Sequence, residues 1–198
     1  MRDAIYLEGV VPPAVLTWQE EQTRFAFQNG HAAFMRNWPY AAALLGRPGE
    51  SRVAGRFAVA AMPRANGRSA AALGGAQLAI NARSQQPAEA WALIAYLTAP
   101  AQMLERTAAT GQFPARRSVY DDPALASALP IRPGQARAII DRAVPRPVTP
   151  VYTQLSGILQ IHLHRALTRQ EAPAAALSAA ATEMRTLLES FGLEKPAS

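Results

Sequence analysis

The sequence of 198 residues contains no cysteine. This absence excludes disulfide bonds, thiol catalysis and metal sites with cysteine ligands. It is compatible with an oxidising compartment, where unpaired thiols are a liability, and does not establish one. Any chemistry of this chain must therefore be carried by oxygen and nitrogen groups or by aromatic rings.

Long apolar runs are also missing. No run approaches the roughly 18 residues that a membrane-spanning helix needs, and the first residues do not have the basic and apolar pattern of a leader. Ile5, Tyr6 and Leu7 instead follow directly after Met1-Arg2-Asp3. We therefore expect the chain to begin inside a folded element, with an upstream part missing.

Lysine is nearly absent, since Lys195 is the single lysine among 20 Lys and Arg residues; the formal net charge is +6. The arginines are scattered singly along the chain, whereas a nucleic-acid-binding surface gathers its basic residues on one face or segment. We expect no nucleic-acid partner. A hydrophobic content of 49% with 17% charged residues is typical of a globular domain.

The stretch 27–40 is the most informative part of the sequence. Asn29-Gly30 supplies the left-handed backbone that ends a helix, and the apolar run Ala32 to Met35 is short enough for a buried strand. Pro39 prevents that strand from continuing at the centre of a sheet. The stretch therefore predicts a strand with Trp38 at its carboxyl end, which is where ligands lie in open α/β sheets.

Further apolar runs predict strands over Phe57 to Met62 and Gln77 to Ala82. Thr17 is in position to cap a helix whose first turn carries two glutamates. Strands that repeatedly precede helices favour an α/β fold. The expected helices cover residues 18–28, 41–45, 88–97, 100–109, 135–142, 152–167 and 173–191.

The residues alone leave several roles open. Trp38 is either a core aromatic or a contact residue, and Gly74-Gly75 is either a bend or a close approach of the backbone to a ligand. Arg146, held in a rigid proline-rich segment, either caps a helix, pairs with a carboxylate or binds a ligand. His162 and His164 lie two apart on one helix and so face different directions. We expect no metal site and no catalytic residue.

Four ordered motifs resemble the extracellular solute-binding proteins of sugar-importing ABC transporters (family 1), with trehalose- and maltose-binding proteins as the nearest kind. The resemblance covers nearly the whole chain but only the C-terminal half of the family pattern. The motifs are Phe27-Gln28-Asn29-Gly30 with Ala32 to Pro39, Leu73-Gly74-Gly75, Phe113-Pro114-Ala115-Arg116, and Pro145 to Tyr152.

The resemblance implies a periplasmic-binding-protein-like α/β fold of class II, in which two lobes close over a sugar. Residues 1–75 and 116–198 would form mainly the second, C-terminal lobe. Residues 76–115 would return to the first lobe, with hinge crossings near 74–76 and 113–116. The helices of that returning piece would lack the sheet they pack on, which would leave an apolar face around Trp91, Ile94 and Leu97 partly exposed or re-packed.

The resemblance also implies a ligand site. Trp38 matches an aromatic residue that lies against a sugar ring, and Gly75, preceded by Gly74, matches a glycine whose backbone approaches the ligand. Arg146 matches an arginine that donates to sugar hydroxyls, for which its five fixed donors are suited. Ala76 departs from the pattern, because relatives often carry a second tryptophan there.

Tyr40 is a further candidate for the ligand site, with packing as its alternative role. The function implied is that of a non-enzymatic binding subunit without cofactors, which binds a mono- or oligosaccharide of the trehalose, maltose or sucrose type. It would deliver the sugar to the permease subunits of the transporter, in the periplasm or outside the cell, and would be monomeric at full length. The alternatives are a sugar-active α/β enzyme domain and a truncated chain without binding activity of its own.

Overall fold

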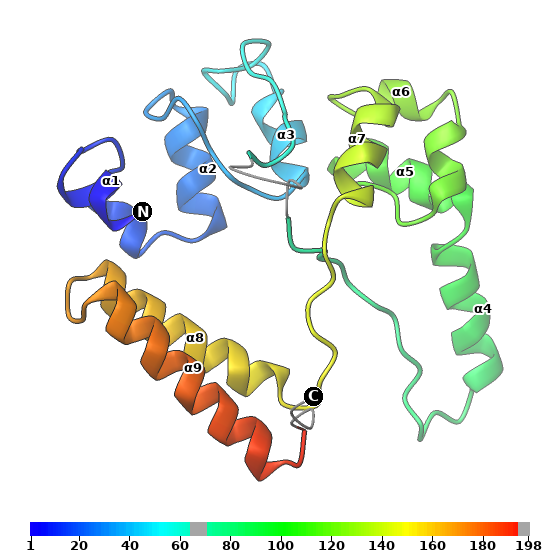
Figure 1. Cartoon of the computed structure of the whole chain (residues 1–198). Coiled ribbons are helices and arrows are strands. Elements are labelled where there is room, and N and C mark those ends of the chain that lie inside the picture. Colours follow the sequence, from blue (N-terminus) through cyan, green and yellow to red (C-terminus); the bar gives the residue numbers. More distant parts are fainter. Residues whose placement is uncertain (64–70, 194–198) are drawn as a thin grey trace. The chain divides into compact units, whose positions relative to one another are not determined.

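The computed structural model of the chain describes residues 1–63 and 71–193, and their regular structure is helical (Figure 1). None of the helices in these two ranges is long and apolar enough to cross a membrane. The 3₁₀ helices are η1 (Pro13–Leu16) and η2 (Arg117–Asp121). The α-helices are α1 (Arg2–Tyr6), α2 (Glu20–Gln28), α3 (Tyr40–Leu45), α4 (Pro87–Leu97), α5 (Pro100–Thr110), α6 (Leu125–Ala128), α7 (Pro133–Asp141), α8 (Tyr152–Leu167) and α9 (Pro173–Ser190).

The helix predictions are confirmed to within two residues at most boundaries, because their start and stop signals are local. A proline begins each of the helices α4, α5, α7 and α9, a position where its missing N–H is not needed. One boundary was wrong. Thr17 does not cap α2, because its hydroxyl donates to the Ala14 carbonyl oxygen at 3.1 Å and closes η1 instead.

The three predicted strands are not formed: residues 32–35, 57–62 and 77–82 are irregular. A strand depends on a neighbouring strand for its backbone hydrogen bonds and its cross-strand side-chain pairs. Within the described ranges the only β pairing is one isolated parallel bridge between Ala72 and Val144. The apolar pattern of a segment predicts a strand correctly only where a partner is present.

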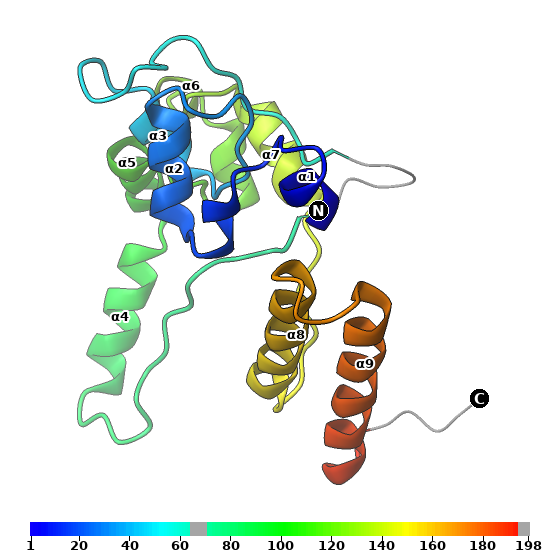
Figure 2. The same cartoon turned by 90° about the vertical axis from the view of Figure 1, so that its left-hand side faces the viewer.

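The chain divides into two compact units, residues 20–146 and residues 1–19 together with 147–198. The second of these contains α1, η1, α8 and α9. Helices α8 and α9 lie side by side as an antiparallel hairpin (Figures 1 and 2). The buried residues are Leu155, His162 and Ala166 on α8 and Ala176 and Ala180 on α9.

The unit of residues 20–146 has its core among α5, α6, α7 and η2, which Figure 1 shows gathered together. Gly111 joins α3 to this core. A Cβ built on Gly111 would lie 2.3 Å from the Cβ of Ala43, and its φ is +70°, so only glycine fits both the space and the left-handed backbone. The buried core residues are Met103, Val119, Tyr120, Leu125, Leu129 and Ala136.

Helix α4 is exposed although it is apolar on all sides. None of its residues is buried, and Trp91 is 63% exposed and Tyr96 59% exposed. Glu89 is its only charged residue. Of the two expected outcomes for its apolar face, partial exposure and re-packing, the structure shows exposure, with Trp91 and Leu97 exposed and Ile94 half-buried. A helix without a polar face is normally covered.

Candidate functional site

The loop that carries Trp38 is attached to the first turn of α2 by three side chains. Asn37 Nδ2 donates to the Glu20 backbone oxygen at 3.0 Å, and Trp38 Nε1 donates to Glu20 Oε1 at 3.3 Å. The Tyr40 hydroxyl donates to Glu21 Oε1 at 2.7 Å. Two adjacent glutamates therefore hold the loop against the helix, in addition to placing negative charge where the helix dipole favours it.

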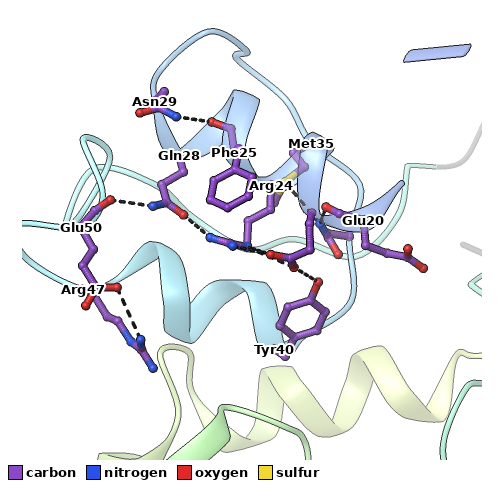
Figure 3. A network of polar contacts seen from close by, with 11 residues as sticks. Glu20, Arg24, Phe25, Gln28, Asn29, Met35, Tyr40, Arg47 and Glu50 are labelled. Carbon is purple, nitrogen blue, oxygen red and sulfur yellow. Dashed lines mark hydrogen bonds and ion pairs between the residues drawn. The ribbon is translucent and has the colours of Figure 1, made fainter. Parts of the chain in front are cut away.

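Behind these glutamates lies a buried arginine (Figure 3). Arg24 is 8% exposed, and its Nε donates to Glu21 Oε2 at 3.0 Å. Its guanidinium also bonds to the side-chain oxygen of Gln28, whose Nε2 in turn donates to the Glu50 carbonyl oxygen at 2.6 Å. The arrangement satisfies a buried cation on several sides, as burial of a charge requires.

This network sets the protonation states of its members. Burial, reinforced by the bond to Glu21, raises the pKa of Tyr40 to about 12. The hydrogen bond from Arg24, followed by that from Tyr40, lowers the pKa of Glu21. A backbone N–H bond, followed by that from Trp38, lowers the pKa of Glu20. At neutral pH the phenol is thus a donor and both carboxylates are acceptors.

The Trp38 indole is confined at its other end by Gly74. A Cβ built on Gly74 would lie 2.6 Å from Cζ3 and 2.9 Å from Cη2 of the indole, distances that real Cβ atoms do not adopt. The backbone at Gly74 therefore passes directly beside the six-membered ring. The structure brings together two residues that the sequence singled out separately.

The isolated bridge brings a third predicted residue to this region. Leu73 N–H donates to the Val144 oxygen at 2.8 Å, and Val144 N–H donates to the Ala71 oxygen at 2.7 Å. Gly74, Gly75 and Ala76 therefore continue from one side of the bridge, and Arg146 lies two residues beyond the other.

The predicted ligand residues differ in their exposure and in whether their polar groups already have hydrogen-bond partners. Gly75, with φ of +148°, and Ala76 are exposed, and Trp38 is half-buried. Arg146 is exposed, and no described residue holds its side chain in an ion pair or hydrogen bond, so the two alternative roles for this arginine find no support within the described ranges. Tyr40 is half-buried with its hydroxyl committed to Glu21, which corresponds to its packing role.

Sequence reasoning missed Glu20, Glu21 and Arg24 as determinants of this site. The two glutamates were interpreted only through the helix dipole, and Arg24 as one of many scattered arginines. No local pattern could have found the glutamates, because their partners in the loop lie 17 to 19 residues away along the chain. Arg24 bonds to Glu21 and Gln28 at helical spacing, a local signal that could have singled it out.

Other features of the described residues do not add a second candidate site. No group of three or more His, Asp or Glu residues in the described ranges could hold a metal ion. An open pocket of about 300 Å³ lies in the unit of residues 1–19 and 147–198. Its lining includes Arg169, whose guanidinium lies 3.8 Å from the centre of the Tyr6 ring, but none of the predicted ligand residues.

Comparisons with known proteins agree on one family. Residues 1–133 match the family model described as bacterial extracellular solute-binding protein. Over 170 residues the chain is 39% identical to a probable ABC transporter-binding protein of Deinococcus radiodurans, covering 84% of this chain and 40% of that protein. It is 26% identical over 185 residues to a probable amino-acid ABC transporter periplasmic-binding protein, y4oP, of Sinorhizobium fredii, covering 93% and 41%.

A solved structure resembles the fold closely. The chain described as maltose-bound T. maritima MalE3 is 41% identical and superposes with a TM-score of 0.88, covering 95% of this chain and 48% of that one. The fold is therefore similar to part of a periplasmic-binding-protein-like structure, although the described residues are mostly helical. The chain spans less than half the length of the relatives it matches.

Proposed function

Because this chain belongs to the bacterial extracellular solute-binding proteins, we propose that it contributes one wall of a sugar-binding cleft in the binding subunit of an ABC importer. The family is one of transporter binding proteins, which are not enzymes. The alternative of a sugar-active enzyme domain is thereby set aside. We propose the sugar ligand, the cleft and the transporter partner for this chain.

The observation that carries the proposal is the contact between Trp38 and Gly74 beside the Ala72–Val144 bridge. Trp38 is half-buried, and the flat indole is suited to sugar rings, which offer apolar C–H faces with hydroxyls at the rim. Arg146, free of described partners, supplies fixed donors for such hydroxyls. The exposed backbone of Gly75 and Ala76 allows a ligand to approach closely.

The division of the chain into lobes is a further part of the proposal, and it differs from the packing of the described residues, in which α5 shares one core with α6, α7 and η2. We assign residues 1–75 and 116–198 to the second lobe of a class II solute-binding protein and residues 76–115 to the first, with hinge crossings near 74–76 and 113–116. The exposed apolar helix α4 lies in the returning piece, where the rest of the first lobe would cover it. The unformed strand at 77–82 would find its partner in the same part of the first lobe.

In this proposal the mechanism is closure of two lobes over the ligand. A sugar drives closure only through contacts that exist in the closed form alone. The closed form would then be presented to the permease subunits in the periplasm or outside the cell. The Deinococcus relative, named a probable ABC transporter-binding protein, supports the partner class, and the maltose-bound relative supports a sugar of the trehalose, maltose or sucrose type.

The first experiment is a calorimetric titration of the 198-residue chain with trehalose, maltose and sucrose. We expect weak or undetectable binding, because one wall supplies only part of the contacts. Micromolar affinity would contradict the proposal that this chain contributes only one wall of the cleft. A chimera in which this chain replaces the matching half of the maltose-bound T. maritima protein is expected to restore tight binding, and a folded chimera that binds no sugar would contradict the proposal.

Two glycine variants test the site itself in the same chimera. Gly74→Ala places a Cβ against the indole and is expected to weaken sugar binding by about tenfold or more, the effect of displacing one platform residue. Gly134→Ala is the matched control, since nothing lies within 4 Å of a Cβ there. Equal sugar affinities of the two variants would show that Trp38 does not contribute to sugar binding.

The remaining alternative is a truncated chain without binding activity of its own. It predicts no response of Trp38 to sugar in the chain itself. Titration with amino acids belongs in the same series, because the Sinorhizobium relative is named an amino-acid binding protein. Binding of an amino acid in place of a sugar would overturn the substrate class.

A further inference from the structure

Glu20, the first residue of α2, accepts two hydrogen bonds from the loop that carries Trp38, one at its backbone oxygen and one at its side chain. Its backbone oxygen accepts from Asn37 Nδ2 at 3.0 Å, and its carboxylate Oε1 accepts from Trp38 Nε1 at 3.3 Å. Asn37 Oδ1 also accepts from the Trp38 backbone N–H at 2.7 Å. The position of the loop and the orientation of the indole are therefore fixed by separate bonds.

The carboxylate and Gly74 hold the indole at different ends. Nε1 belongs to the five-membered ring, whereas Cζ3 and Cη2, the atoms nearest to Gly74, belong to the six-membered ring. Contacts at both ends leave little freedom of rotation about the side-chain bonds. In Figure 3 the Glu20 side chain points away from the cluster of Arg24 and Tyr40, so this carboxylate serves the indole and not the buried arginine.

We propose that Glu20 is the positioning residue of the Trp38 platform, by which we mean the indole ring that would lie against the sugar. Its carboxylate fixes the orientation of the indole against Gly74. It also strengthens the face of the ring as an acceptor for sugar C–H groups. The second part follows because an acceptor with a negative charge draws the N–H proton and increases the electron density of the ring. The proposal rests on the proposed function in so far as the platform binds a sugar.

The contacts allow the role of the carboxylate to be separated from that of the loop. Glu20→Ala removes the bond to the indole, together with the backbone N–H bond to the same carboxylate and its charge in the first turn of α2. It leaves the other two bonds of the loop, because the bond from Asn37 goes to the backbone and that from Tyr40 goes to Glu21. Glu20→Gln retains a neutral acceptor for Nε1 and removes the charge. Glu89→Ala is the matched control, a glutamate in the first turn of another helix, α4.

The primary measurement needs no ligand. In a ¹⁵N-labelled sample of the full chain, the indole N–H resonance of Trp38 is assigned by its loss in Trp38→Phe, which separates it from Trp18 and Trp91. We expect Glu20→Ala to shift this resonance and to speed its hydrogen exchange, Glu20→Gln to restore the slow exchange, and Glu89→Ala to leave both unchanged. An unchanged Trp38 resonance in Glu20→Ala would overturn the positioning role.

The second measurement is made in the chimera with the T. maritima protein, where tight binding is expected: maltose is added, and the same resonance is followed for the unchanged chain and for each variant. We expect Glu20→Ala to weaken the response by about fivefold in affinity, the size of one lost hydrogen bond, with Glu20→Gln between it and the unchanged chain. An equal maltose affinity of Glu20→Ala and the unchanged chain would show that the Glu20 carboxylate does not strengthen sugar binding by the Trp38 indole. If Glu20→Ala shifts the resonance but neither the folded chimera nor its variants respond to maltose, the positioning role stands and the proposed function fails.

Discussion

At the scale of single residues, the site depends on polar groups that hold an aromatic loop. The Glu21 carboxylate accepts hydrogen bonds from the Tyr40 hydroxyl and from Arg24 of its own helix. A buried cation, a carboxylate and a phenol are thereby joined by a continuous set of hydrogen bonds. Each group changes the proton affinity of its neighbour, because the charged form of one is stabilised by the others. The loop is therefore sensitive to pH at both extremes.

The alkaline side provides a prediction for Tyr40. Its pKa is about 12 in the folded chain against 10.0 for the free group, so the unfolded chain loses its proton first as the pH rises. The stabilisation is complete below pH 10 and is lost between pH 10 and about 12. We expect the free energy of unfolding to fall less steeply across this range in Tyr40→Phe than in the unchanged chain.

Urea unfolding at a series of pH values measures this difference. At neutral pH Tyr40→Phe should cost about 1 kcal/mol for the lost hydrogen bond. Tyr96→Phe is the control, since Tyr96 is 59% exposed on α4. Parallel stability curves for Tyr40→Phe and the unchanged chain would show that the phenol is not held by Glu21. Tyr120, whose pKa burial also raises to about 12, is retained in both proteins and does not affect the comparison.

At the scale of elements, helices differ widely in how much of their apolar surface is covered. Leu125 in α6 is 0% exposed, whereas Leu93 in α4 is 57% exposed. Both are leucines in apolar helices, and the sequence alone does not distinguish them. The cost of removing a side chain depends on the atoms packed around it and not on its type.

We therefore expect opposite results from the same substitution. Leu125→Ala should cost about 2–5 kcal/mol of stability, because it leaves a cavity among α5, α6 and η2. Leu93→Ala should change stability by less than about 0.5 kcal/mol. Thermal or urea unfolding followed by circular dichroism compares the two. A large cost at Leu93 would mean that α4 is covered by something that the described residues do not contain.

The helices were predictable and the strands were not, for the same physical reason. Pro87, Pro100 and Gly111 act within one turn of the residues they direct, and helical hydrogen bonds close within the segment. The runs at 57–62 and 77–82 have the composition of strands, but their hydrogen bonds require a partner from elsewhere in the chain. Only Ala72 and Val144 found one in the described residues.

At the scale of the whole molecule, the two units differ in how the chain builds them. Residues 20–146 form one unit from a single continuous segment, and the other combines residues 1–19 with residues 147–198. The candidate site, with Trp38, Gly74 and Arg146, belongs entirely to the continuous unit. A continuous segment with its own hydrophobic core satisfies the usual requirements for independent folding.

We predict that a fragment of residues 20–146 folds by itself. It should show helical circular dichroism and a cooperative unfolding transition, since the cluster around Leu125 and the network around Arg24 lie inside it. The fragment of residues 147–198 is the natural comparison, because it lacks the N-terminal part of its unit. A fragment of residues 20–146 that unfolds without cooperativity would show that its core depends on the other unit.

The sequence by itself determined the helices, the absence of thiol chemistry and the family, since these rest on local signals, composition and ordered motifs. It also singled out Trp38, Gly74, Gly75, Ala76 and Arg146, whose roles in a sugar site are still predictions. Only the tertiary structure decided that Gly74 lies against the Trp38 ring and that Glu20 holds the indole. These contacts join residues 18 or more positions apart, and packing, which no local pattern encodes, brings them together.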